Sequence, residues 1–286
     1  MKEAQFYRKL KNKLVQCQLC PHFCAIKESM TGKCKVRKNI NGVLYSLSYG
    51  KPVSINLDPI TKKPLYHFLP QTLTFSIGMA GCNLSCQWCQ NWEISQKTAE
   101  EFKTEEISPE KLVEEALKSG CPSVSYTYTE PFISYEYVFD LAKLAKKRGL
   151  KNILVTNGYV NEAPFEKIAP YIDAMNIDLK SFNEKTYEKF CGGKLKPVLE
   201  TIKRAYKAGI HIELTTLLIP GLNDNEKELE KIAKFIASVG KKIPWHISRF
   251  FPMYKMLDKN ATPVSSLEKA YKIGKKRLKY VYIGNV

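Results

Sequence analysis

The sequence predicts an α/β fold, a partial (β/α)6 TIM-like barrel with a small cysteine-rich N-terminal extension. From residue 72 onward, short β-rich runs alternate with amphipathic helical segments, and repeated βα units of this kind build parallel sheets with right-handed crossovers. Before Gln71 this alternation is absent, and four of the nine cysteines fall between residues 17 and 34. We therefore expect a cysteine-rich segment with a hairpin at 1–70 and the barrel at 71–286.

The barrel is expected to contain six strands, each short and rich in β-branched or aromatic residues. Helix-period segments separate them, as in "SPEKLVEEALKSG", where we expect Ser108 as N-cap, Pro109 in the first turn and Gly120 as C-cap. In the N-terminal segment, Asn41 and Gly42 form a pair typical of a hairpin turn. The expected strands are 72–79, 123–128, 152–156, 174–179, 211–218 and 245–251.

The amino-acid composition limits the classes to which the protein can belong. The chain has 286 residues, 44% hydrophobic and 26% charged, which argues against wholesale disorder. The net charge of +17 would suit a nucleic-acid partner, but the lysines are scattered, so a solvated basic surface is the favoured interpretation. We see no signal peptide and no apolar run of about 20 residues, so we expect a cytoplasmic protein with no membrane partner. Cysteines there stay reduced, and clustered ones are expected to bind metal.

The ends of the expected strands carry the polar motifs. In barrels of this kind functional groups collect at the carboxyl ends of the strands. Here those ends carry "GCNLSC", "YTEP", "TNG", "DLK", "LIPG" and "RFFP".

The first motif continues as "GCNLSCQWCQNW" and places Cys82, Cys86 and Cys89 within eight residues. A structural zinc site prefers four closed ligands, and so does an ordinary four-iron cluster. A cluster held by only three thiolates leaves one iron free to bind a substrate. The spacing suits a loop around such a cluster at the end of the first strand, with Gly81 easing the tight backbone.

These three cysteines, with Trp88 before the last, resemble the signature of the radical S-adenosylmethionine (SAM) superfamily. The resemblance implies a 4Fe-4S cluster whose open iron chelates the amino and carboxylate groups of SAM. Electron transfer from the reduced cluster then cleaves SAM to methionine and a 5′-deoxyadenosyl radical, which abstracts hydrogen from a substrate.

The other strand ends resemble motifs of the same superfamily. "YTYTEP" is similar to its GGEP turn, with Thr129 at a glycine position and Glu130 matching, and this turn receives the SAM ammonium on backbone carbonyls. Asn91 matches a residue that lines the adenine. Asn157 of "TNG" is expected among the cofactor-binding residues. Glu130 alone would also serve as a carboxylate at a helix start.

"NIDLK" resembles the fourth-strand motif of pyruvate formate-lyase activating enzymes. The resemblance implies that Asp178 holds the ribose hydroxyls of SAM and Lys180 its carboxylate. The alternative is an internal salt bridge. Tyr254 stands where those enzymes carry a ribose-contacting histidine, and His246 is either a core residue or a site residue. Cys121 and Cys191 are expected to be isolated. No residue is assigned a catalytic acid, base or nucleophile role.

Most of the chain resembles one subgroup, the AmmeMemoRadiSam system radical SAM enzymes, which are relatives of the pyruvate formate-lyase activating enzyme. The resemblance implies an activating-enzyme-like oxidoreductase, an electron donor such as flavodoxin or ferredoxin, and a protein substrate or another substrate. The stretches that carry it are "CQLCPHFCAIKESMTGKCKVRKN", "LYSLSYGKPVSINLDPITKKPLYHFLP", "GCNLSCQWCQNWEISQ" and "LIPGLND".

A second cysteine group lies in the N-terminal segment. Cys17, Cys20, Cys24 and Cys34 supply four thiolates, enough to close a zinc site or to ligate a second iron-sulfur cluster. Zinc would staple a segment with little core of its own. Unligated buried thiols are the third interpretation.

The alternative to a radical SAM enzyme is a metal-stapled RNA-binding or RNA-modifying protein, in which the basic excess contacts phosphates. Nucleic acid is the less favoured partner. Production of 5′-deoxyadenosine separates an enzyme from a binder.

Overall fold

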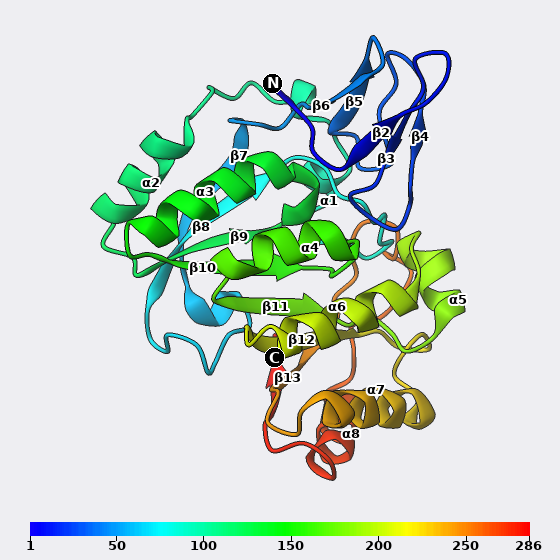
Figure 1. Cartoon of the computed structure of the whole chain (residues 1–286). Coiled ribbons are helices and arrows are strands. Elements are labelled where there is room, and N and C mark those ends of the chain that lie inside the picture. The colour runs from blue at the N-terminus through cyan, green and yellow to red at the C-terminus, as the bar shows by residue number, and fades with distance from the viewer.

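The computed structural model describes residues 1–286 and is built on an eight-stranded sheet with the order β14-β13-β12-β11-β10-β9-β8-β7 (Figure 1). Every neighbouring pair is parallel except β7 with β8, which is antiparallel. The expected α/β fold class with a partial barrel is confirmed. The strands are β7 (Pro52–Pro59), β8 (Leu73–Met79), β9 (Ser123–Thr127), β10 (Lys151–Thr156), β11 (Ala174–Asp178), β12 (His211–Leu218), β13 (Trp245–Arg249) and β14 (Val281–Gly284).

The two edge strands were not among the six expected ones. β7 begins and ends with proline, a residue that edge strands tolerate because they leave backbone N–H groups unpaired on one side. β14 has four residues and follows a lysine-rich stretch, so no pattern marks it. Because β7 pairs with β8, the barrel sheet includes residues from before position 71. The division at residue 70 stays a prediction about domains.

Helices cover the outer face of the sheet (Figure 1). In α2 the side chain of Ser108 accepts a hydrogen bond from the Lys111 N–H at 3.3 Å, as expected of an N-cap. Ser119 is the C-cap, and Gly120 follows it with φ +73°. The longer helices are α2 (Pro109–Lys118), α3 (Tyr135–Lys147), α4 (Glu162–Ile168), α6 (Leu195–Lys207), α7 (Glu226–Val239) and α8 (Val264–Lys275).

Short helical turns lie in the connections. Those at the ends of β8, β9 and β11 bear on the site described below. They are η1 (Ile60–Lys62), α1 (Trp92–Ser95), η2 (Ala99–Glu101), η3 (Pro131–Ser134), η4 (Ala169–Tyr171), α5 (Glu184–Thr186) and the π-helical turn η5 (Tyr187–Cys191). None of the helices combines the length and the apolar composition that crossing a bilayer requires.

The N-terminal segment forms two small antiparallel sheets beside the barrel (Figure 1). The expected hairpin is present: Asn41 and Gly42 both have positive φ, as a two-residue turn between twisted strands requires. One sheet contains β1 (Lys2–Glu3), β6 (Val43–Ser46) and β5 (Arg37–Ile40), and the other contains β2 (Tyr7–Lys9), β3 (Val15–Cys17) and β4 (Ala25–Ile26).

The segment between β7 and β8 closes the barrel at the beginnings of its strands. Leu65 is fully buried with Ile60 against Ile153 of β10 and Ala174 of β11. This burial leaves the opposite ends of the strands free to surround a cavity.

Candidate active site

A cavity of about 690 Å³ extends from the carboxyl ends of the parallel strands into the barrel, where Pro64 and Tyr66 of the closing segment also line it. This volume is in the range of small-molecule and cofactor sites. All nine barrel residues expected to bind the cluster or SAM line it, although they come from four different strand ends. They are Cys82, Cys86, Cys89, Asn91, Thr129, Glu130, Asn157, Asp178 and Lys180.

The loop after β8 carries the three cysteines, and polar groups of the chain contact their sulfurs. The Leu84 N–H donates to Cys82 Sγ at 3.4 Å, and Asn157 Nδ2 lies 3.6 Å from the same sulfur. Ser95 Oγ, in α1, is 3.2 Å from Cys89 Sγ. Hydrogen bonds of this kind stabilise thiolates that ligate a cluster, so the donor set fits an anionic iron-sulfur centre.

Cys191 corrects one expectation. The sequence suggested an isolated residue, yet the π-helical turn brings its thiol into hydrogen-bonding contact with Cys86. That hydrogen bond lowers the pKa of Cys86, and burial acts against it. The Ser85 N–H also donates to the Cys191 carbonyl at 2.8 Å, so this turn holds the middle of the cysteine loop.

Gly81 precedes the first cysteine of the loop and has φ +87°, a conformation that side chains disfavour. A Cβ there would also lie 2.4 Å from the Cys34 carbonyl oxygen. Glycine is therefore required by both conformation and space, and the loop rests directly on the N-terminal segment.

The turn after β9 contains a tyrosine where the resembling motif has glycine. Tyr128 takes φ +68°, and its ring is held by Asp58 and Lys63. Its carbonyl accepts a hydrogen bond from Asn91 Nδ2 at 2.7 Å, and the Thr129 hydroxyl donates to the Met79 carbonyl at 2.7 Å. Two of the expected cofactor residues thus fix the backbone of the turn.

Glu130 ties together the ends of β9 and β10. Its carboxylate accepts from the Thr156 hydroxyl at 2.8 and 2.9 Å and from the backbone N–H of Asn157 at 2.8 Å. It also accepts from the Phe132 N–H at 3.0 Å, so it caps η3 as the alternative interpretation expected. Burial raises the pKa of Glu130 to about 7.

Asp178 and Lys180 form an ion pair across alternate positions at the end of β11. Lys180 Nζ lies 2.8 Å from Asp178 Oδ2, and both side chains face the cavity. The salt bridge of the alternative interpretation is therefore present. Asp178 keeps about a third of its side chain exposed, at 37%, which leaves carboxylate surface available to a ligand.

Two charged groups were missed, Asp58 in the cavity wall and Glu213 behind the cavity-lining His246. Asp58 of β7 lies 2.7 Å from Lys63 Nζ, and these two residues hold Tyr128. Glu213 of β12 is buried and lies 2.6 Å from His246 Nε2 and 3.0 Å from His211 Nε2. Burial acts to raise the pKa of Glu213, but the two histidines and two backbone N–H groups lower it to about 2. The alternation of His211, Glu213 and Thr215 in one strand was the available signal.

His246 lines the cavity, whereas Tyr254 does not. His246 is 4% exposed and both lines the cavity and binds Glu213. Tyr254 stacks on Trp92 with ring centroids 5.3 Å apart, so it packs on the residue that follows Asn91.

Comparison with known proteins agrees with this geometry. The family model of the Radical SAM superfamily matches residues 76–236, more than half of the chain. The uncharacterized protein MJ0808 of Methanocaldococcus jannaschii is 47% identical over 288 residues, covering 100% of this chain and 86% of its own length. The pyruvate formate-lyase-activating enzyme of Clostridium pasteurianum is 23% identical, covering 56% of this chain and 67% of its own.

Among solved structures, a domain of a pyruvate-formate lyase-activating enzyme from Bacteroides vulgatus has a TM-score of 0.52 at 20% identity, covering 57% of this chain and 99% of that domain. This likeness concerns the partial-barrel fold. The sequence match and the fold define a class, iron-sulfur enzymes that act on SAM. The chain belongs to the radical SAM superfamily and is an enzyme.

Membership implies a 4Fe-4S cluster and SAM as cofactors. When bound, the reduced cluster would supply the electron that cleaves SAM to methionine and a 5′-deoxyadenosyl radical. The chain itself offers three sulfurs, two of them with polar groups of the chain in contact, a turn fixed by Asn91 and Thr129, and the Asp178–Lys180 pair at the end of β11.

Proposed function

We propose that this protein binds a 4Fe-4S cluster through Cys82, Cys86 and Cys89, cleaves SAM reductively, and directs the 5′-deoxyadenosyl radical to a partner protein. One observation carries the proposal: the three sulfurs and the six expected SAM-binding residues line a single cavity. The proposed setting is the cytoplasm, with flavodoxin or ferredoxin as the electron donor.

The SAM molecule is proposed to lie between the cysteine loop and β11. Asp178, whose carboxylate keeps exposed surface, would accept the ribose hydroxyls. Lys180 would meet the carboxylate of SAM, and Asn91 would line the adenine. Thr129, Glu130 and Asn157 are proposed to hold the turn and the Cys82 sulfur in place, because their own hydrogen bonds run to the backbone and to that sulfur.

A protein substrate is favoured by the relatives. Pyruvate formate-lyase-activating enzymes match more than half of the chain by sequence, and their names describe action on another enzyme. The cavity is wide and partly open, and the exposed residues Gln90 and Asn285 line it, so a peptide segment could enter it from solvent.

We also propose that Cys17, Cys20, Cys24 and Cys34 bind a metal centre of their own. Three of these residues are buried, and all four line one small cavity. This site is separate from the cysteine loop of the barrel.

Two assays test the function. Anaerobically reconstituted protein given SAM and dithionite should form 5′-deoxyadenosine, and none should form with the Cys86→Ala variant. Absence of the product from reconstituted wild-type protein would refute the proposal.

The substrate class is tested by deuterium transfer. Extract from cells grown in deuterated medium is split into samples treated with protease or with ribonuclease, and each is offered to the enzyme. A protein substrate predicts that deuterium enters 5′-deoxyadenosine with the ribonuclease-treated sample and is lost after protease. The reverse pattern would replace the partner protein by RNA.

A further inference from the structure

One wall of the barrel cavity is a row of residues on three neighbouring strands. Asp178 of β11 pairs in register with Thr215 of β12, and Thr215 pairs with His246 of β13. All three residues line the cavity. Neighbouring strands lie about 4.8 Å apart, so the backbone at His246 is about 10 Å from the backbone at Asp178. His246 therefore lies two strands away from the residue proposed to hold the ribose of SAM.

Glu213 holds the imidazole of His246 from behind this wall. Its Oε1 accepts hydrogen bonds from the His67 N–H at 2.8 Å and from His211 Nε2 at 3.0 Å. Its Oε2 accepts from the Tyr66 N–H at 3.0 Å and from His246 Nε2 at 2.6 Å. Burial acts to raise the pKa of Glu213, but these donors hold it at about 2. The carboxylate is thus an anion whose lone pairs are all used within the chain.

This arrangement decides which nitrogen of His246 is free. An ionised carboxylate only accepts hydrogen bonds, so the hydrogen on Nε2 points to Glu213 and, in the neutral ring, Nδ1 keeps its lone pair. Nδ1 has no hydrogen-bond partner in the chain, and it is not among the unpartnered polar atoms that the protein buries completely. The side chain is 5% exposed and lines the cavity, so Nδ1 opens toward the cavity.

Two aromatic rings hold the imidazole in this orientation. The Tyr66 ring meets it edge-on with centroids 4.6 Å apart, and the Tyr282 ring stacks on it with centroids 5.4 Å apart. The Tyr282 hydroxyl is itself 2.7 Å from His67 Nε2. An imidazole fixed by a carboxylate and two rings presents Nδ1 in one direction, which is the preorganisation that a binding site requires.

We infer that His246 binds the substrate of the proposed reaction, with Nδ1 accepting a hydrogen bond from an N–H group next to the carbon that loses hydrogen. The inference rests on the proposed function and adds a substrate-binding residue to it. A polypeptide carries an N–H beside nearly every Cα, so the proposed protein substrate supplies such a donor. Thr215, which lies between His246 and Asp178, does not compete for it, because its hydroxyl donates to Asn176 Oδ1 at 3.0 Å.

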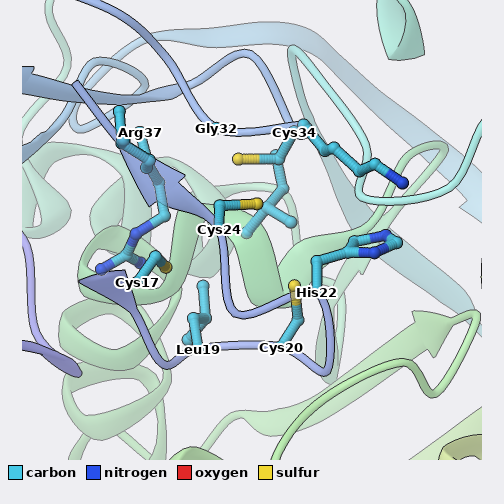
Figure 2. A pocket seen from close by; sticks show the side chains of 11 residues that line it. Cys17, Leu19, Cys20, His22, Cys24, Gly32, Cys34 and Arg37 are labelled. Carbon is cyan, nitrogen blue, oxygen red and sulfur yellow. The ribbon is translucent and has the colours of Figure 1, made fainter. Parts of the chain in front are cut away.

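The other three histidines of the chain lie outside the barrel cavity. His22 lines the small cavity of the N-terminal cysteines (Figure 2). His67 binds Tyr282, and His211 binds Glu213, but neither of these two histidines lines the barrel cavity. His211 is therefore a matched control for His246, because it contacts the same carboxylate from outside the cavity.

Matched glutamine substitutions separate substrate binding from a structural role. Glutamine places an amide N–H near the position of Nε2, so His246→Gln and His211→Gln each keep a donor for Glu213. Only His246→Gln removes the Nδ1 lone pair from the cavity. With a limiting amount of ribonuclease-treated extract from deuterated cells, the fraction of 5′-deoxyadenosine that carries deuterium should fall about tenfold in His246→Gln. It should stay at the wild-type level in His211→Gln.

Equal deuterated fractions in the two variants would overturn the inference while the proposed function stands. Absence of 5′-deoxyadenosine from the wild-type protein would instead refute the proposed function and the inference together. The two failures are therefore distinguished by the product of the wild-type protein.

A second measurement does not depend on turnover. In NMR spectra of the full chain with isotope-labelled histidine, couplings between the carbon-bound ring hydrogens and the ring nitrogens report which nitrogen carries hydrogen. The signals that disappear in His246→Gln identify His246. We expect a protonated Nε2 and a bare Nδ1. A hydrogen on Nδ1 would overturn its role as an acceptor.

Discussion

The two cysteine groups of this chain differ in number, in enclosure and in the parts of the fold that carry them. The group in the barrel has three cysteines on one loop and opens on a cavity of about 690 Å³. The N-terminal group has four cysteines from several segments around a space of about 10 Å³. Catalytic metal sites keep an open position, and structural or auxiliary sites are closed by the protein. The contrast is the one expected if the barrel site receives a substrate and the N-terminal site holds the proposed metal.

The side chains around the two cysteine groups also differ in polarity. Polar side chains from four strand ends face the barrel cavity, whereas mostly apolar side chains and the buried Arg37 surround the N-terminal space. A large core between sheet and helices stabilises the barrel, and Val15, Ile26 and Leu44 of the N-terminal segment pack into its edge. The N-terminal sheets have strands of only two to four residues, so we expect them to depend more on the metal proposed to bind there.

The largest expected effect separates the two groups directly. Cys86→Ala should abolish 5′-deoxyadenosine formation and leave the melting temperature of the protein nearly unchanged. Cys34→Ala should lower the melting temperature by at least about 5 °C, because it opens a site that holds small sheets together. Product assay and thermal unfolding measure the two effects, with Cys121→Ala as control. Equal loss of stability in both variants would show that the two cysteine groups do not differ in their contribution to stability.

A substitution at Gly81 tests the contact between the cysteine loop of the barrel and the N-terminal segment. Gly81→Ala places a Cβ against the Cys34 carbonyl and keeps φ positive, so it should lower the free energy of unfolding by about 4 kcal/mol. Gly120→Ala is the matched control, because Gly120 also has positive φ but no atom within 4 Å of the added Cβ. It should lose only about 1 to 2 kcal/mol in urea unfolding. Equal losses would show that the two regions do not bear on each other here.

Glu130 makes the barrel site sensitive to pH. Burial raises its pKa from 4.5 to about 7, so the folded chain holds a proton that the unfolded chain has lost. The free energy of unfolding should fall by about 3 kcal/mol between pH 4.5 and 7 and then level off. Glu130→Gln should lack this contribution. Urea unfolding of the two metal-free proteins across that range measures the difference, and parallel curves would contradict it.

The smallest expected effect tests whether Asp178 and Lys180 bind SAM in the barrel cavity. Asp178→Ala and Lys180→Ala should each weaken SAM binding about tenfold while the iron content stays unchanged, because each loses one charge-assisted hydrogen bond. Calorimetric titration with SAM gives the affinity. Unchanged affinity in both variants, with reduced stability, would return the pair to a purely internal salt bridge.

Features that depend on residues close together in the chain could be predicted from the amino-acid sequence. Strand and helix periods placed the six central strands, because burial of one face repeats within a few residues. The spacing of cysteines identified both groups, and the turn chemistry of Asn41 and Gly42 identified the hairpin.

Contacts between residues far apart in the chain became visible in the folded structure. β7 and β14 joined the sheet, Cys191 reached Cys86, and Asp58 reached Tyr128, 70 positions along the chain. Tertiary packing also set the size of each cysteine cavity and left Arg37 buried without full pairing. Such contacts leave no periodic pattern in the chain, because the energy that forms them comes from burial and hydrogen bonding between segments far apart in sequence.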